Sequence, residues 1–378
     1  MHYRTLSEAE KIEILGQFGL IYLRRAFEDE VIPEGRSDTK FRFMVDNHSK
    51  KEEVVLTIYE TPDVHINGRE PFYAEASTRY AAHVAQKLID MKDRDGNPVR
   101  AALASPYQTM DTAMPFIHRL FGGVEKVVTI TPFIERARDT MDASDTREAG
   151  RALAAMHRAA EDFTEITLPN NFGPAQLRGA FAAFTHERET MVQKLSVHLG
   201  MSNDQASLFM DRTATLLDKI LTAWDAIAPK LATGWINGDY FPDNTLPSRD
   251  GKFITFDLGM ICQDTLIYDV AIGMNAWSFS GAECDRAQAA MFLAGYNNVK
   301  EITPPELDAL PLAAAVAGIR WTMSRMGKLM DDLPTRSPVD SLNQARFWEI
   351  FIDQGQRIEL SGTATISDRV SQIGLKPQ

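Results

Sequence analysis

The stretch from residue 233 to residue 277 limits the possible folds of this chain more than any other. It reads as a short strand, a polar loop over residues 237–244, a second strand that ends in an acidic turn, and then a helix. Asp250-Gly251 is a turn signal, and the alternation of residues 252–256 is typical of a strand. The sequence therefore predicts a strand–loop–strand–helix unit with polar side chains at the strand ends.

Three side chains in this unit have the chemistry that phosphoryl transfer requires. Asn244 follows Asp239 by five residues, and Asp257 comes at the end of the next strand. Phosphoryl transfer needs one carboxylate that orients and deprotonates the attacking hydroxyl, and oxygen ligands for magnesium. We assign the first role to Asp239 and the second to Asn244 and Asp257, because Mg²⁺ prefers oxygen ligands. The alternative is a polar hairpin in which these residues only form turns, but the combined pattern favours a kinase-type site.

The same unit resembles the catalytic segment of the aminoglycoside phosphotransferase and choline kinase superfamily. Within it, the chain is most similar to the homoserine kinases of the protein-kinase-like type, through the phrases at residues 238–244, 268–272 and 275–277. The resemblance extends to about residue 358. One departure is Asn237, which stands where the superfamily usually has a histidine that positions the loop.

This resemblance implies an α/β (α+β) fold of two lobes. Residues 1–130 would form a small β-rich nucleotide-binding lobe, and residues 131–360 a larger helical lobe for catalysis and acceptor binding. Residues 361–378 are expected to be a polar tail. The hinge would include residues 127–135, with Phe133, Ile134 and Glu135 contacting adenine.

The cations that would contact ATP phosphates are less evident from the sequence. The loop at residues 33–40 would cover the phosphates, but it holds one glycine. Arg36, Lys40 and Arg42 are the candidates, and the alternative is solvated charge on an edge hairpin. The lysine that most kinases carry on the next strand would stand near Thr57, so the identity of the replacing cation stays open.

Helices are expected at residues 6–18 and 71–92 and through most of the chain after the hinge. The later ones should cover residues 145–157, 175–200, 204–228, 284–297, 303–330 and 342–358. Glu75 lacks the usual lysine partner and is expected to be solvated. His157 has apolar neighbours on its helix, so we interpret it as structural.

Two further residues are assigned by position. Asp269 begins a helix and is expected to accept backbone N–H groups of the catalytic loop. Arg320 and Arg325 lie five apart on one helix, a separation of about 140°, so one of them should face the cleft. A guanidinium recognises a carboxylate in a bidentate way, and we choose Arg320 for the acceptor because a run of small residues precedes it. The alternative is an arginine that pairs with a neighbouring helix.

Composition excludes several classes of partner. The net charge of −12 argues against a nucleic-acid groove and against an anionic membrane surface. Two cysteines give no disulfide framework, and no apolar run approaches the ~20 residues that span a bilayer. The sequence is that expected of a cytoplasmic monomer or homodimer.

The predicted reaction uses ATP and Mg²⁺ and transfers the γ-phosphoryl group to a small-molecule hydroxyl acceptor, L-homoserine by resemblance. One alternative is a kinase for another small alcohol, such as an aminoglycoside, choline or a sugar. A second alternative is a nucleotide-binding protein without catalysis, which Asn237 and the missing lysine at Thr57 would suit.

Overall fold

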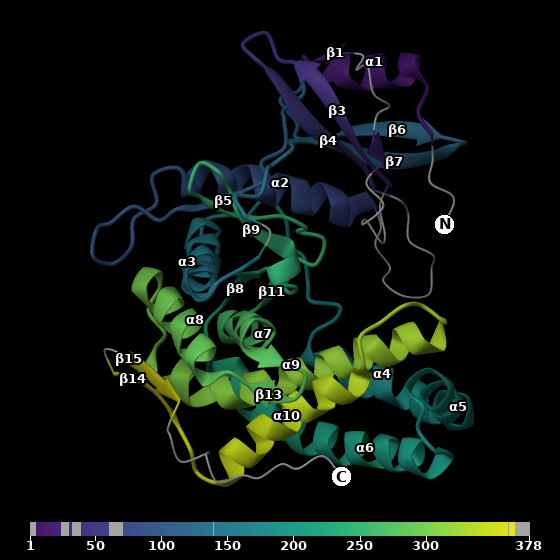
Figure 1. The fold of residues 1–378 in the computed structure, drawn as a ribbon, viewed down its shortest axis with the longest axis vertical. Helices are drawn as coiled ribbons and strands as arrows, with labels where there is room; N and C mark the ends of the chain where they lie inside the picture. Colours follow the sequence, from purple (N-terminus) through teal and green to yellow (C-terminus); the bar gives the residue numbers. More distant parts are fainter. Residues whose placement is uncertain are drawn as a thin grey trace.

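The computed structural model describes residues 5–23, 30–31, 39–59, 71–138, 140–361 and 363–366. A β-rich lobe lies at one end of the molecule, and helices build the other end (Figure 1). The small-lobe sheet has the strand order β1-β3-β4-β7-β6, with β2 also on β3, and all its pairs are antiparallel. These strands are β1 (Ile21–Leu23), β2 (Glu30–Val31), β3 (Thr39–Asp46), β4 (Lys51–Ile58), β6 (Ile117–Phe121) and β7 (Val124–Pro132).

Helix α1 (Glu8–Gln17) covers the outer face of this sheet. Ser7 and Glu10 form a capping box, in which each side chain accepts the backbone N–H of the other residue. The buried Ile14 and Leu15 of α1 share an apolar core with alternate residues of β3 and β4, such as Phe43 and Leu56. The other face of the sheet, which carries the intervening residues, is turned toward the helical lobe (Figure 1).

Helix α2 (Pro71–Leu88) and strand β5 (Ala101–Leu103) pack with the core of the helical lobe, although they precede the hinge in sequence. Tyr80 of α2 contacts the rings of Phe163 and Trp235 at centroid distances of 5.8 and 5.6 Å. Strand β5 pairs in parallel with β10 (Phe253–Thr255). The α1-facing side of the small-lobe sheet and most of the α2–β5 segment therefore belong to different hydrophobic cores, although Ala74 of α2 also packs with Val127 of β7.

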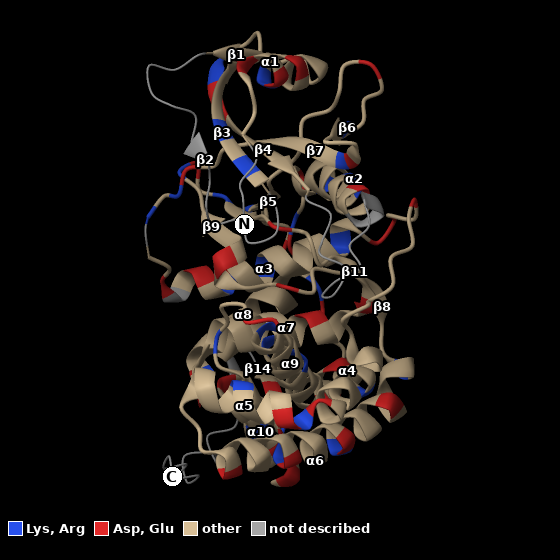
Figure 2. Cartoon of the chain, turned by 90° about the vertical axis from the view of Figure 1, so that its right-hand side faces the viewer, with Lys and Arg blue, Asp and Glu red and all other residues tan. Residues whose placement is uncertain are grey.

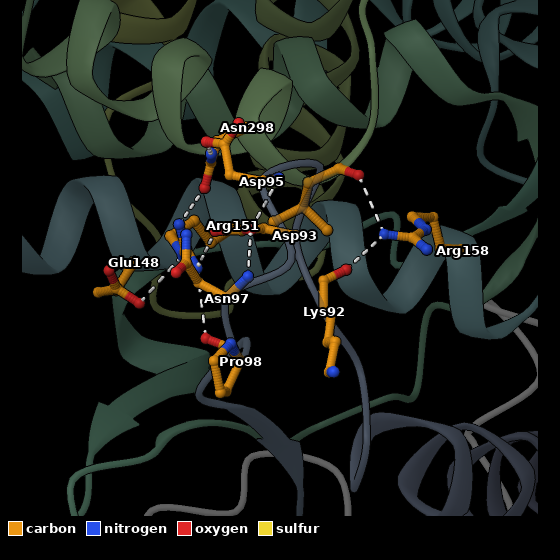
Figure 3. Close-up of polar contacts among 10 residues, drawn as sticks. Lys92, Asp93, Asp95, Asn97, Pro98, Glu148, Arg151, Arg158 and Asn298 are labelled. Atoms are coloured by element: carbon orange, nitrogen blue, oxygen red, sulfur yellow. Dashed lines mark hydrogen bonds and ion pairs between the residues drawn. The ribbon is translucent and has the colours of Figure 1, made fainter.

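The turn between α2 and β5 is fixed to the helical lobe by the polar network in Figure 3. Asp93 Oδ1 accepts the backbone N–H groups of Asp95 and Asn97, which shapes the turn. Its Oδ2 accepts Arg151 Nη2 at 3.1 Å, and Arg151 also donates to Asn298. These contacts tie residues 93–98 to two helices of the large lobe.

The helical lobe is arranged around α7, in which every residue except Ala276 is buried. Helices α3, α8 and α9 contact it. A Cβ added at Gly150 of α3 or at Gly295 of α8 would lie 2.0 Å from a backbone oxygen of the other helix, so these helices cross in backbone contact. The helices are α3 (Ala143–Ala159), α4 (Pro174–His186), α5 (Arg188–Leu199), α6 (Asn203–Ile227), α7 (Leu266–Ser278), α8 (Arg286–Val299), α9 (Pro304–Met330) and α10 (Pro338–Asp353).

Short strands hold the loop over residues 237–244 above α7. Strand β8 (Thr233–Ile236) pairs with β11 (Cys262–Thr265), and β9 (Thr245–Pro247) pairs with β10, both antiparallel. Two more ladders join β12 (Phe279–Ser280) to β13 (Glu283–Cys284) and β14 (Ile358–Ser361) to β15 (Thr363–Ile366).

Some predicted boundaries were wrong. The helix expected over residues 175–200 ends at His186 and restarts as α5, because Glu187 has a non-helical ψ of 34°. The last helix spans Pro338–Asp353 rather than residues 342–358, since Ser337 caps it and Pro338 suits a first turn. The helix expected over residues 145–157 already begins at Ala143, because Asp142 caps it. Within the expected tail, residues 363–366 pair with β14.

Figure 2 marks acidic and basic residues on both lobes, with several acidic residues along α6. No helix in the described ranges is both long enough and apolar enough to cross a bilayer.

Candidate active site

The carboxylate of Asp269, in the first turn of α7, fixes the backbone of the candidate catalytic loop. Its Oδ2 accepts the N–H of Asn237 at 2.7 Å, and its Oδ1 accepts the N–H of Gly238 at 2.9 Å. His157 of α3 donates from Nε2 to Oδ2 at 2.9 Å, because a carboxylate can only accept. Asp269 and His157 are both fully buried, so the loop is anchored in the core of the helical lobe.

Tyr296 of α8 completes this anchor from the other side of the imidazole. Its hydroxyl lies 2.7 Å from His157 Nδ1. Burial raises the pKa of Tyr296 well above its usual range, so the hydroxyl stays protonated and can donate to Nδ1. The two ring nitrogens of His157 bond to Asp269 and Tyr296, and neither of them bonds to Asp239. These contacts confirm the structural interpretation of His157.

Asp239 projects from the anchored loop with its position set by two neighbours. Asn237 Oδ1 accepts the backbone N–H of Asp239 at 3.0 Å. Asn244 Nδ2 donates to the backbone oxygen of Asp239 at 2.9 Å and to its Oδ2 at 3.1 Å. Asp239 is half-buried, so its carboxylate can meet a substrate. Asn237 therefore supplies a backbone-positioning bond where a histidine would usually stand.

Asp257 follows directly after the residue that pairs with Asn244. The β9–β10 ladder extends by one bond, from Phe256 N–H to the Asn244 oxygen at 3.0 Å. Asp257 is exposed and has φ of +57°, a left-handed conformation that costs energy for a residue other than glycine. Strain of this kind is concentrated at functional sites. The sheet register brings the predicted residues Asn244 and Asp257 to adjacent positions.

The donor set fits a magnesium ion that is shared with a nucleotide. Asn244 uses its Nδ2 on Asp239, which leaves its Oδ1 available as a ligand beside the exposed Asp257 carboxylate. The described residues contain no group of three or more His, Cys, Asp or Glu side chains suited to a metal. A site with one carboxylate and one amide suits Mg²⁺, which retains waters and phosphate oxygens.

Gly238 was missed as a site residue by sequence reasoning. Its φ is +72°, and a Cβ there would lie 2.7 Å from the backbone oxygen of Met260. Only glycine fits, because the catalytic loop packs against the segment that follows Asp257. The signal in the sequence was the glycine itself, directly before Asp239.

The predicted hinge residues are partly engaged already. The Phe133 N–H donates to the Glu53 oxygen at 2.8 Å, so it cannot also serve as an adenine donor. Glu135 forms an ion pair with Arg249 at 2.5 Å through its side chain. The backbone N–H groups of Ile134 and Glu135 donate no hydrogen bond to other described residues. Of the three residues expected to contact adenine, these two keep an N–H group that a ligand could use.

Lys40 and Arg42 occupy the same face of β3, with different surroundings. Arg42 Nη2 contacts Glu53 Oε2 at 2.5 Å, and its guanidinium stacks 3.7 Å above the Phe133 ring. Lys40 is half-buried. Arg36, which belongs to the phosphate loop considered above, lies outside the described residues.

The two arginines of α9 have different environments. Arg325 donates to the Ser337 oxygen at 3.1 Å and to Ser341 Oγ, so it joins α9 to α10. Burial, and then the charge of Arg336, lowers the pKa of Arg325 to about 10. Arg320 is 6% exposed, and its Nη1 has no hydrogen-bond partner among the described residues.

Arg320 lies close to the catalytic loop through its neighbour. Its guanidinium is 3.9 Å from the ring centroid of Trp321, and Trp321 meets Phe241 edge to face at 4.7 Å. Burial raises the pKa of Cys262 on β11, and the Arg320 charge partly opposes that rise. The buried guanidinium is thus near both the catalytic loop and β11. The Phe241–Trp321 contact was not visible from the sequence.

Comparisons with known proteins identify the family of this chain. The model of a phosphotransferase enzyme family matches residues 29–310. A homoserine kinase from Methylorubrum populi is 30% identical over 264 residues, which cover 68% of this chain and 76% of that protein. A homoserine kinase from a Caulobacter species is 25% identical over 330 residues, covering 86% and 87%.

Solved structures share the architecture at low identity. An aminoglycoside phosphotransferase from Alicyclobacillus acidocaldarius aligns with a TM-score of 0.55 and 11% identity, over 94% of this chain and 95% of that one. An amicoumacin kinase in complex with AMP-PNP, Ca²⁺ and Ami aligns with a TM-score of 0.57 and 15% identity, over 90% of this chain and 93% of that one.

The fold and site together define an ATP-dependent small-molecule kinase of the protein-kinase-like type. The chain belongs to the phosphotransferase enzyme family whose model matches residues 29–310. The predicted two-lobe α/β fold and the kinase activity are confirmed, and the acceptor is the remaining question.

Proposed function

We propose that this kinase phosphorylates the side-chain hydroxyl of a small amino acid, L-homoserine. The observation that carries the proposal is Arg320, whose buried guanidinium has an unpaired Nη1 near the catalytic loop. A buried guanidinium without a full set of acceptors is unfavourable unless an anion completes it. The α-carboxylate of an amino acid is such an anion. Both curated relatives named above are homoserine kinases.

The same guanidinium disfavours the cationic acceptors. Aminoglycosides and choline carry positive charge, and a like charge close to a buried arginine costs free energy. A sugar would leave the Nη1 donor without an anionic partner. The alternative of binding without catalysis would leave the bonds that orient Asp239 without a role.

The residues of the chain have distinct tasks in this reaction. Bound Mg–ATP supplies the γ-phosphoryl group and the charge that stabilises its transfer. Asp239, oriented by Asn237 and Asn244, accepts the proton of the acceptor hydroxyl. Asn244 and Asp257 hold Mg²⁺, while Asp269 keeps the loop in place. Ile134 and Glu135 bind the adenine edge through their backbone groups.

An acceptor screen tests this proposal. ADP release is measured with L-homoserine, L-threonine, L-serine, choline, a sugar and an aminoglycoside, each against a control without acceptor. We expect the highest kcat/KM with L-homoserine. Homoserine lactone, which lacks the free carboxylate and hydroxyl, and 3-amino-1-propanol, which is homoserine without its carboxylate, are the controls. A higher kcat/KM for the amino alcohol or an aminoglycoside would contradict the proposal.

A further inference from the structure

Thr57 on β4 marks a missing positive charge in the nucleotide site. Kinases of this fold generally place a lysine at this point of the small-lobe sheet, where it contacts ATP phosphates. Threonine has no charge, so either another residue supplies the positive charge or the nucleotide site lacks a positive charge at this point. The strand register identifies which side chains lie next to Thr57.

Lys40 on β3 is directly opposite Thr57 in the antiparallel β3–β4 ladder. On the other side, Thr57 is opposite Thr129 of β7. Directly opposed residues point to the same face of a sheet and have Cβ atoms about 5 Å apart. Lys40, Thr57 and Thr129 therefore form one row across the sheet.

This row lies on the face that is turned away from α1. Phe41 and Phe43, the neighbours of Lys40 in the alternation, are buried in the core with α1. Val127, two residues from Thr129 and so on the same face as the row, packs with Ala74 of α2. The Lys40 row consequently faces α2 and the helical lobe, where the catalytic loop lies (Figure 1).

Arg42 occupies the next row, opposite Val55, and is nearer the hinge. Its ion pair with Glu53 and its stacking on Phe133 already match its charge and cover its planar face. The Lys40 side chain, by contrast, forms no hydrogen bond or ion pair with another described residue. Glu75 of α2 was expected to be solvated, but its carboxylate lies 3.1 Å from His118 Nε2. The partner of this carboxylate is therefore His118 and not Lys40.

We propose that Lys40 supplies the phosphate-binding charge that is missing at Thr57, and that Arg42 instead braces the hinge. Neighbouring strands are only about 4.8 Å apart, and the flexible four-carbon stem of a lysine on β3 can reach from its own strand to the adjacent β4. The ammonium group can therefore occupy the space that a lysine at residue 57 would use. The proposal rests on the ATP site of the proposed function, but it does not depend on which acceptor is phosphorylated.

The test compares nucleotide binding in matched variants by calorimetry, without acceptor. Mg–ATP and adenosine are titrated into the wild type, Lys40→Ala, Lys40→Arg and Arg42→Ala. Adenosine carries no phosphate, so it reports the hinge alone. We expect Lys40→Ala to weaken Mg–ATP at least tenfold with adenosine affinity within twofold of wild type. Lys40→Arg should retain most of the Mg–ATP affinity, because it keeps the charge.

A charge relocation provides the sharpest comparison. The double variant Lys40→Thr with Thr57→Lys exchanges the two opposed residues and keeps the composition. We expect it to bind Mg–ATP within about threefold of wild type, whereas Lys40→Thr alone should lose the affinity as Lys40→Ala does. Arg42→Ala should change the affinities for Mg–ATP and adenosine by the same factor.

Three results would overturn the proposal. One is an unchanged Mg–ATP affinity in Lys40→Ala, and another is a loss in Arg42→Ala that is confined to Mg–ATP. Equal losses of Mg–ATP and adenosine in Lys40→Ala would also contradict it, since they would indicate a structural role. Failure of the homoserine assignment would appear in the acceptor screen and would leave these titrations unaffected.

Discussion

The Oδ1 atom of Asp269 accepts the backbone N–H of Gly238 at 2.9 Å, although 31 residues separate them in the chain. This bond joins the most buried helix of the large lobe to the loop that presents Asp239. A second bond from Oδ2 to the Asn237 N–H makes the contact bidentate. The position of the candidate base is thus determined from within the core.

We predict that Asp269→Asn lowers kcat by tenfold or more while the KM for ATP changes little. An amide has one acceptor oxygen, so one of the two backbone N–H groups or the His157 bond is lost. Steady-state kinetics and thermal unfolding check this, with Asp264→Asn on the neighbouring strand β11 as the control. If the variant has a lower Tm than wild type but an unchanged kcat in its folded fraction, Asp269 contributes to stability alone.

Asp257→Ala is expected to weaken Mg-dependent nucleotide binding about tenfold or more, because it removes the anionic ligand beside Asn244. Asp257→Asn should lose less, since asparagine tolerates the φ of +57° and retains an oxygen ligand. Calorimetry with ATP, with and without Mg²⁺, measures both. If alanine leaves the Mg-dependent affinity and kcat intact, the left-handed Asp257 is only a turn residue.

The local motif was readable from the sequence because its chemistry lies in short spacings. Asp239, Asn244 and Asp257 fall on one loop and one strand end, and the β9–β10 pairing brings them together. The role of Asp269 was also predictable from its place at a helix start. The helix break at Glu187 was not, because no glycine or proline marks it.

Tertiary packing and strand register explain what the sequence left open. Lys40 and Arg42 look equivalent in the sequence, and only the pairing with Thr57 and the contacts of Glu53 and Phe133 separate them. Similarly, the sequence predicted a border between the lobes near residue 130, at the expected hinge. Helix α2 precedes that border, but most of its buried residues belong to the core of the helical lobe. Such long-range packing has no local signal.

Arg320→Ala should raise the KM for the amino-acid acceptor at least tenfold, with the KM for ATP within about twofold of wild type. This corresponds to losing ~1.5–3 kcal/mol of charge-assisted hydrogen bonding. Arg320→Lys should recover part of the loss, and Arg325→Ala, which removes the α10 contact, should lower stability instead. A normal acceptor KM in Arg320→Ala would remove the carboxylate contact.

Gly150→Ala is predicted to destabilise the protein by about 3 kcal/mol or more, since the added methyl would lie 2.0 Å from the Phe292 backbone oxygen. Gly179→Ala on α4 is the matched control, because nothing lies within 4 Å of its Cβ position. That control should be neutral or stabilising by about 0.5–1 kcal/mol through helix propensity. Chemical denaturation measures both changes, and equal effects would show that α3 and α8 do not cross so closely.

The central claim is that Asp239 deprotonates the hydroxyl of a small amino acid during phosphoryl transfer, and ³¹P NMR of the reaction mixture tests it most directly. With Mg–ATP and L-homoserine, the wild type should produce ADP and a phosphomonoester signal coupled to the terminal CH₂ protons. Asp239→Asn should form this product about 10²–10⁴ times more slowly while still binding Mg–ATP. A product formed at the wild-type rate by Asp239→Asn, or ADP formed with inorganic phosphate alone, would contradict the account.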